Sequence, residues 1–144
     1  MATMKINVGI KGWKASNILK LDVPAEMDRT VKSGVPFVDD LLGGNGFTPS
    51  TSIMFTGTPG AGKTTLLLQT ADALTGRGHV VVYSSGEESL YQVRKVARRL
   101  NLKHGFLADQ ETHVPTLIKT VKKLQAQVKG SPGRQHFQIK LDGL

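Results

Sequence analysis

Residues 57–65 read Gly-Thr-Pro-Gly-Ala-Gly-Lys-Thr-Thr, a full match to the pattern of a glycine, four free positions, Gly-Lys and then Ser or Thr. The five residues before this loop, 52–56 (Ser-Ile-Met-Phe-Thr), read as a short buried strand. The residues from Thr64 to about Leu74 read as a helix. A strand, a glycine loop and a helix in this order predict a loop that holds the phosphates of a nucleotide.

The residue types in this loop explain how it would bind phosphate. Glycines at 57, 60 and 62 leave the backbone bare enough to wrap closely around phosphate oxygens. Lys63 is expected to reach the β- and γ-phosphates, the Thr64 hydroxyl to ligate Mg²⁺, and Thr65 to lie near the α-phosphate. The predicted nucleotide-binding residues are Gly57, Thr58, Pro59, Gly60, Ala61, Gly62, Lys63, Thr64 and Thr65.

Size and composition restrict the remaining possibilities. A chain of 144 residues is expected to bury one core, and it contains no apolar run long enough to span a membrane. Its N-terminus leads into no apolar signal core, so export is not expected. The absence of cysteine excludes disulfides and thiolate zinc sites, and it fits a reducing cytoplasm, which we expect as the compartment.

The chain is strongly basic, with a formal net charge of +8. Clustered lysine and arginine favour a polyanionic partner, because they release the counterions that phosphates hold. Composition cannot distinguish nucleic acid from a bound nucleotide or from a simple solvated surface. The charge therefore leaves nucleic acid as one of three open interpretations.

The apolar pattern predicts alternating helices and strands. Residues 1–33 form an N-terminal lead-in, in which Ile6, Val8 and Ile10 alternate as in a half-exposed strand, and 34–144 form the main domain. Beyond the loop we expect helices at about 36–42, 89–101 and 115–128, and strands at 80–83, 106–108 and 136–141. This order predicts an α/β fold with a mainly parallel sheet, whose ligands bind at the carboxyl ends of the strands.

Glu87 and Glu88 follow the predicted strand at 80–83 and the turn Ser84-Ser85-Gly86. Glu87 is the candidate general base, because a carboxylate at a strand end can orient water for attack on the γ-phosphate. Acidic residues also favour the N-terminus of the next helix without any catalysis. Position alone leaves both interpretations open.

Asp142 is a candidate ligand of Mg²⁺, because it ends the predicted strand 136–141. This stretch resembles the second nucleotide-site motif of phosphate-loop proteins, in which a strand ends in an acid that holds the metal through water. The four histidines show no zinc-ligand spacing, so no zinc is expected. Trp13 is assigned no role.

Three segments together resemble the RecA-like ATPases, and within them the RadA (Sms) DNA-repair and recombination family. They are Ser33-Gly34-Val35-Pro36 with Asp39 and Leu42-Gly43-Gly44, the phosphate loop, and residues 83–89 (Tyr-Ser-Ser-Gly-Glu-Glu-Ser). The helix that follows, Gln92 to Leu102, is similar to a helix of that family. The resemblance covers about residues 30–110, and KaiC-type ATPases share its first half.

This resemblance implies ATP hydrolysis coupled to DNA, a homo-oligomeric ring or filament, and nucleotide sites completed by a neighbouring subunit. It also favours Glu87 over Glu88, because the family's catalytic glutamate comes directly after the residue that matches Gly86. The family's four-cysteine zinc module cannot exist in a chain without cysteine. Its sheet strand and DNA-contacting loops beyond the Asp142 region are missing, so the sequence is expected to be a truncated relative.

Three functions follow as hypotheses. The first is an ATP-hydrolysing module that acts in DNA recombination and repair and binds single-stranded DNA as an oligomer. The second is a small-molecule kinase, which would need lid arginines, whereas Arg94, Arg98 and Arg99 read as one face of a helix. The third is an assembly module that binds nucleotide without turnover, so that the nucleotide shifts the chain between monomer and oligomer.

Overall fold

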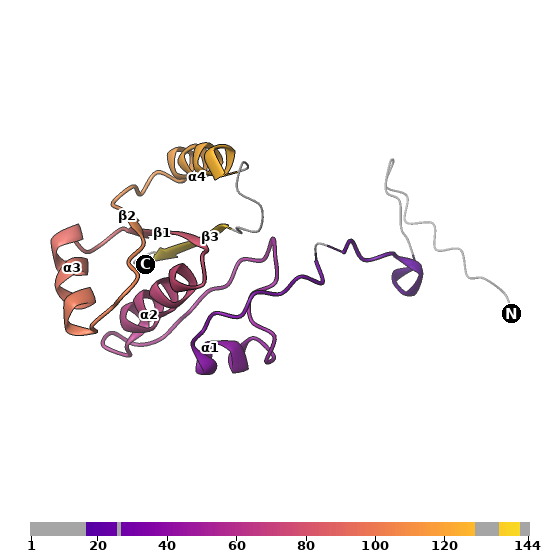
Figure 1. Ribbon diagram of the computed structural model, residues 1–144, viewed down its shortest axis with the longest axis horizontal. Coiled ribbons are helices and arrows are strands. Elements are labelled where there is room, and N and C mark those ends of the chain that lie inside the picture. The colour runs from indigo at the N-terminus through magenta and orange to yellow at the C-terminus, as the bar shows by residue number, and fades with distance from the viewer. Residues whose placement is uncertain (1–16, 26, 129–135, 142–144) are drawn as a thin grey trace, which may run out of the picture.

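A computed structural model describes residues 17–25, 27–128 and 136–141 (Figure 1). The helices are η1 (Ile18–Lys20, a short 3-10 helix), α1 (Pro36–Leu41), α2 (Lys63–Gly76), α3 (Leu90–Arg99) and α4 (Val114–Val128). The strands are β1 (Val80–Ser85), β2 (Leu107–Asp109) and β3 (His136–Leu141). Each of these except η1 was predicted from the sequence, with bounds that agree within about two residues.

The strands form a parallel sheet in the order β2-β1-β3. Tyr83 on β1 lies opposite Ala108 on one side and Ile139 on the other. The run Val80 to Val82 is apolar without alternation, as expected of a strand that is covered on both faces. The predicted α/β fold with a mainly parallel sheet is therefore confirmed.

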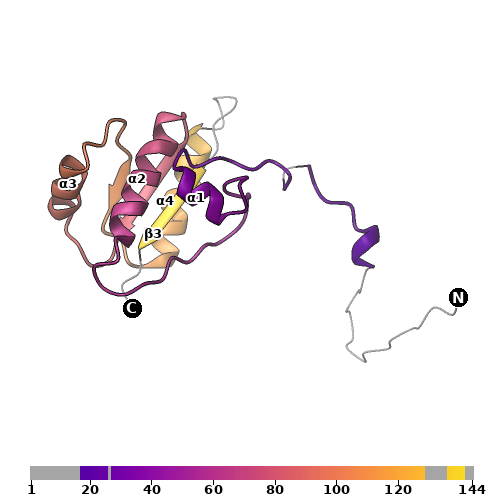
Figure 2. The ribbon, with the colours of Figure 1, turned by 90° about the horizontal axis from the view of Figure 1, so that it is seen from below.

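The helix α2 determines the direction of β1. Only the turn 77–79 joins the two, so β1 runs back along α2 and ends near the point where α2 begins. A 14-residue helix and a six-residue strand are both about 20 Å long, so their ends match. Figure 2 shows the segment that leads into α2 at the same end of the sheet as the arrowhead of β3.

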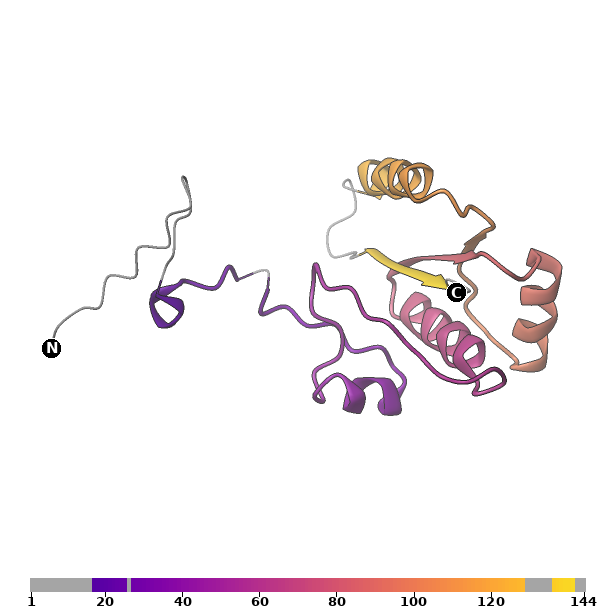
Figure 3. The same ribbon diagram turned by 180° about the vertical axis from the view of Figure 1, so that it is seen from behind.

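The core forms where α2 covers β1. One cluster of buried residues joins Leu68 of α2, Tyr83 of β1 and Val93 of α3, and a second joins Ala71, Leu74 and Val81. The Tyr83 and Phe106 rings pack with their centroids 5.8 Å apart. On the other side of the strands lies α4, which buries Leu117 (Figure 3). Helices on both faces explain why the first half of β1, Val80 to Val82, can be apolar without alternation.

A buried turn precedes α1 and explains the Ser33-Gly34-Val35-Pro36 segment. The Ser33 backbone N–H donates to Asp39 Oδ1 at 2.7 Å, and the Ser33 hydroxyl accepts from Val35 N–H at 2.9 Å. Burial alone would raise the pKa of the Asp39 carboxyl. Hydrogen bonds from Ser33 and Gly34 and the charge of Lys32 more than offset burial, so this pKa is lowered. The motif therefore anchors the entry to the domain.

Asp72, on α2, fixes the turn that leads into β2. Its carboxylate accepts the backbone N–H groups of Lys103 (3.0 Å), His104 (2.8 Å) and Gly105 (2.9 Å). The side chain is only 8% exposed, and burial by itself would raise the pKa of its carboxyl. The three N–H donors and the nearby His104 outweigh that effect and lower the pKa. Nothing in the sequence analysis singled out this residue.

The prediction of a buried strand at 52–56 is wrong. No strand forms there, and Met54 is 78% exposed. A strand needs a partner for its backbone groups, and within the described residues this segment pairs with none of β1, β2 and β3. The polar residues Ser52 and Thr56 at the two ends also gain nothing from burial. The phosphate loop therefore follows an irregular, exposed segment rather than a strand.

Several expectations fall outside the described residues. These are the strand pattern at 6–10 and the residues Trp13 and Asp142. The division of the chain at residue 33 stays a prediction. Among the residues that the structure describes, no helix has the length and apolar character needed to cross a bilayer.

We expect Asp72→Asn to lower the free energy of unfolding by about 1–3 kcal/mol, because the new amide group faces a backbone N–H that it cannot satisfy. The folded-state pKa of Asp72 is lowered, so its stabilising effect is present above the unfolded-state pKa and is lost as pH falls through the folded one. Urea unfolding of both proteins at pH 7 and pH 3 measures this. An unchanged difference between the two proteins at the lower pH would contradict the assigned cause.

Candidate nucleotide-binding site

The phosphate loop forms a tight turn at the start of α2. Ala61 N–H donates to the Thr58 carbonyl at 3.1 Å, which closes the turn. Gly60 and Gly62 have φ of 79° and 84°, in the left-handed region that side chains disfavour. A Cβ at either position would meet no atom within 4 Å, so the space beside the backbone is open. The two glycines thus form a bare, open concave turn.

Lys63 folds back over this loop. Its ammonium donates to the carbonyl oxygens of Gly57 at 2.8 Å and Thr58 at 3.0 Å. An ammonium has three donors, so one remains beyond these two bonds. The positive charge is therefore held at the mouth of the loop, where a phosphate oxygen can pair with it.

The first turn of α2 adds backbone donors at the same place. The first helical hydrogen bond runs from Leu66 N–H to the Gly62 carbonyl at 2.9 Å, so the N–H groups of Lys63, Thr64 and Thr65 precede it. The N-terminal residue Gly62 offers no side-chain cap. Both threonines are half-buried on this turn. Free amides, the positive end of the helix dipole and Lys63 all favour an anion here.

Glu87 lies at the same end of the sheet, because it follows the carboxyl end of β1 and β1 ends near the start of α2. Its side chain is exposed to solvent. No ion pair with Lys63 occurs in the described part of the chain. The fold therefore brings the predicted base to the edge that carries the loop without fixing it to the lysine.

Glu88 occupies a different environment from Glu87. It is half-buried, and within the described residues neither its Oε2 atom nor the Tyr83 hydroxyl has a hydrogen-bond partner. Burial and the negative charge of Glu88 raise the pKa of Tyr83 well above its usual range. The sequence did not indicate this charge interaction, because it depends on how the chain turns between Tyr83 and Glu88. Of the two glutamates, only Glu87 faces solvent freely.

Hydrogen bonds hold the turn that carries these glutamates. Glu88 N–H donates to the Ser85 hydroxyl at 3.0 Å, and the Gln110 side chain donates to the Glu88 carbonyl at 3.3 Å. The Ser84 hydroxyl donates to the Glu111 carbonyl at 2.7 Å. Segments that follow β1 and β2 are thereby tied together, so the turn is positioned by two strands.

The described residues contain the phosphate-binding part of a site for a nucleotide and one of its two predicted Mg²⁺ ligands. The nine predicted loop residues form the turn that leads into α2, with open space beside Gly60 and Gly62, and Thr64 lies on the first helical turn. Asp142, the other predicted metal ligand, lies outside the described residues. In the described ranges, no three histidine or carboxylate side chains gather as a metal site.

Comparison with known proteins identifies the family. The KaiC-type ATPase family matches residues 31–140, which include the phosphate loop, β1 and Glu87. The chain belongs to this family. The resemblance to RecA-like ATPases is therefore confirmed, and the parallel sheet with flanking helices agrees with it.

Two similar curated proteins, from different bacteria, are both DNA repair proteins named RadA. That of Brucella abortus is 41% identical over 92 residues, which are 63% of this chain and 20% of the relative. That of Pseudomonas aeruginosa is 36% identical over 124 residues, 83% of this chain and 27% of the relative. The chain thus spans only about a fifth to a quarter of the length of these relatives. No solved structure matches the chain significantly.

We expect Gly62→Ala to weaken nucleotide binding and to lower stability by about 1–3 kcal/mol, because a side chain at positive φ is strained. Gly43→Ala is the matched control, since Gly43 also has positive φ (76°) and open space but lies after α1. Thermal unfolding and titration with a fluorescent ATP analogue measure both effects. Equal loss of binding in the two variants would show that strain alone is responsible.

Proposed function

We propose that this chain binds ATP with Mg²⁺ and hydrolyses it as a RecA-like module that acts in DNA recombination and repair. The observation that carries the proposal is the phosphate loop with Lys63 folded over it, at the sheet edge that also bears Glu87. Family membership supports ATP as the nucleotide. The RadA relatives support the DNA-repair role.

Each residue has a defined part in the proposed reaction. The loop amides and Lys63 bind the phosphates and offset the charge that develops on the γ-phosphate. Thr64, together with Asp142, would hold Mg²⁺, and the metal would supply further charge neutralisation when bound. Glu87 orients the attacking water and accepts its proton. Its exposure to solvent supports this role, because the attacking water must reach it.

We also propose that the chain binds single-stranded DNA as a homo-oligomer in a ring or filament. The net charge of +8 supports a polyanionic partner. Apolar side chains on the described surface support contact with another copy: Phe37 (61% exposed) and Leu41 (59%) on α1, and Met54 (78%) before the loop. In an oligomer, such side chains are buried between subunits.

Steady-state ATP hydrolysis, with and without single-stranded DNA, tests the catalytic assignment. Glu87→Gln is expected to lower kcat by about 10²–10⁴-fold while ATP still binds, because only proton acceptance is lost. Glu88→Gln is the matched control and keeps most of the turnover, since that carboxylate is half-buried and Glu87 is the exposed one. Lys63→Ala provides the blank.

Three results would contradict parts of this proposal. Unchanged turnover in Glu87→Gln would remove the assigned base. Nucleotide binding without any turnover above the Lys63→Ala blank would favour the assembly module. Phosphoryl transfer from ATP to a nucleoside monophosphate in a product assay would favour the kinase.

Light scattering tests the proposed assembly. We expect the mass of the chain to rise in the presence of ATP and Mg²⁺, and Met54→Ser to reduce that rise because it removes an exposed apolar contact. Leu19→Ser is a control, since Leu19 is also exposed (92%) but lies on η1, far along the chain from the loop. A monomeric mass with and without nucleotide would overturn the proposal.

A further inference from the structure

The exposed face of α3 combines one aromatic side chain with four cations. Tyr91 is followed by Arg94, Lys95, Arg98 and Arg99, which come three, four, seven and eight residues later. All five side chains are exposed. This spacing puts them on one stripe of the helix, about 12 Å long. We refer to these five residues as the α3 stripe.

The α3 stripe has properties that an ordinary solvated helix face lacks. Helix α3 carries no acidic residue, so nothing on it neutralises the four cations. Tyr91 is 89% exposed, although a tyrosine ring of this size gains free energy from burial. An accessible ring beside a row of cations matches the surfaces that bind unpaired nucleotides, where bases stack and phosphates pair with cations.

The rest of α3 holds the stripe rigidly. The opposite side of the helix buries Val93 in the core cluster with Leu68 and Tyr83. A capping box fixes the first turn: Gln92 N–H donates to the Ser89 hydroxyl, and Ser89 N–H donates to the Gln92 side chain at 2.7 Å. A backbone fixed in this way holds the five residues in register, so a ligand that binds has to order their side chains only.

We propose that the α3 stripe is the surface on which this chain binds single-stranded nucleic acid. The inference rests on the proposed DNA-related function and assigns its binding surface. A base stacks on Tyr91, and the phosphates that follow pair with the arginines and Lys95. Stacking on an exposed ring needs an unpaired base, so a duplex binds more weakly. The glutamates 87 and 88 precede Tyr91 and repel phosphate, which directs the backbone toward Arg99.

Fluorescence anisotropy of a labelled oligothymidylate, with the full chain and no nucleotide, tests the surface. The double substitution Arg94→Gln and Arg98→Gln is expected to raise Kd at least 10-fold and to reduce the salt slope of log K by about 1.4, from two lost phosphate contacts. Tyr91→Ala is expected to raise Kd about 5- to 100-fold, whereas Tyr91→Phe keeps the affinity because the ring remains. Circular dichroism of each variant checks that it folds.

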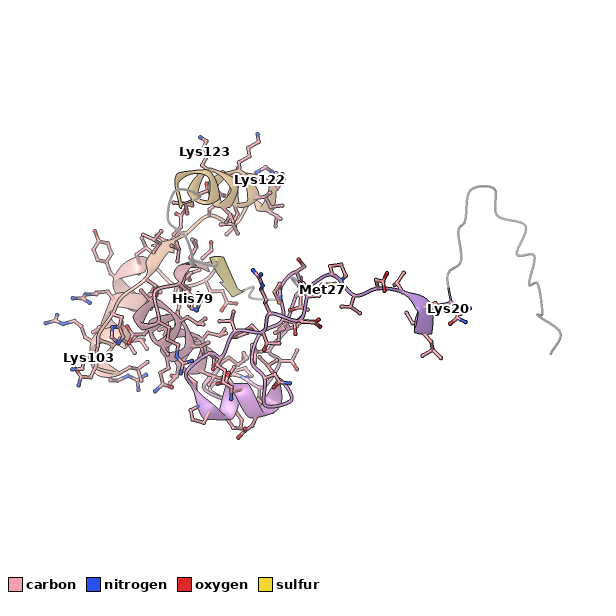
Figure 4. All side chains as sticks on the ribbon, turned by 45° about the vertical axis from the view of Figure 1, so that its right-hand side comes forward. Lys20, Met27, His79, Lys103, Lys122 and Lys123 are labelled. Atoms are coloured by element: carbon pink, nitrogen blue, oxygen red, sulfur yellow. The ribbon has the colours of Figure 1, made fainter. Side chains whose placement is uncertain are left out.

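The matched control removes the same charge from another place. Lys122 and Lys123 lie on α4, at the top of the view in Figure 4. Lys103, in the turn that follows α3, lies at the lower left of the same view. The Lys122→Gln and Lys123→Gln pair is expected to change Kd less than threefold. An equal loss in both pairs would overturn the proposal in favour of non-specific attraction by net charge.

Other outcomes separate this inference from the proposed function. If the chain binds the oligonucleotide and the α3 variants bind as well as the unchanged protein, the surface is wrong but the DNA-binding proposal stands. If the unchanged protein does not bind the oligonucleotide, the α3 surface and the DNA-binding proposal are both wrong. The proposal of ATP hydrolysis is then still tested by the turnover assay without DNA. If polyglutamate displaces the labelled oligonucleotide as effectively as unlabelled oligothymidylate does, the α3 stripe is a binding surface for an acidic protein instead.

Discussion

The packing of α2 against β1 is the contact on which the rest of this structure depends. Leu68, Ala71 and Leu74 of the helix lie against Tyr83 and Val81 of the strand, and this apolar contact makes the two elements antiparallel neighbours. The same contact brings the start of α2 and the end of β1 to one edge of the sheet. The phosphate loop and Glu87 meet there as a consequence of core burial, before any ligand contributes free energy.

Local apolar patterns were enough to predict the helices and strands, because each such pattern lies within the segment that it describes. The failure at 52–56 has a clear cause. Ile53, Met54 and Phe55 give the same local signal as a buried strand, but in the folded chain this segment pairs with none of the three strands. Which segments pair is a property of the whole sheet, which no window of sequence contains.

The conformation of the phosphate loop depends on its local sequence, whereas that of its surroundings does not. Positive φ at Gly60 and Gly62 fits the residue type that tolerates it, and Lys63 bonds only to residues five and six positions away. The Asp72 hydrogen bonds join residues more than 30 positions apart, and the interaction of the Glu88 charge with Tyr83 depends on how the chain turns after β1. No local pattern of sequence indicates such interactions, because their partners come together only in the folded chain.

The segment 86–89 connects the two proposed ligand surfaces. On one side it carries Glu87 at the edge of the phosphate loop, and on the other Ser89 begins α3, with Tyr91 two residues later. Its ends are fixed by the Ser85 bond to Glu88 N–H and by the Ser89–Gln92 capping box. A ligand that shifts α3 must therefore move Glu87 or break one of these bonds. This short connection gives a physical route by which nucleic acid on α3 would change the position of the water-orienting carboxylate, and with it the rate of hydrolysis.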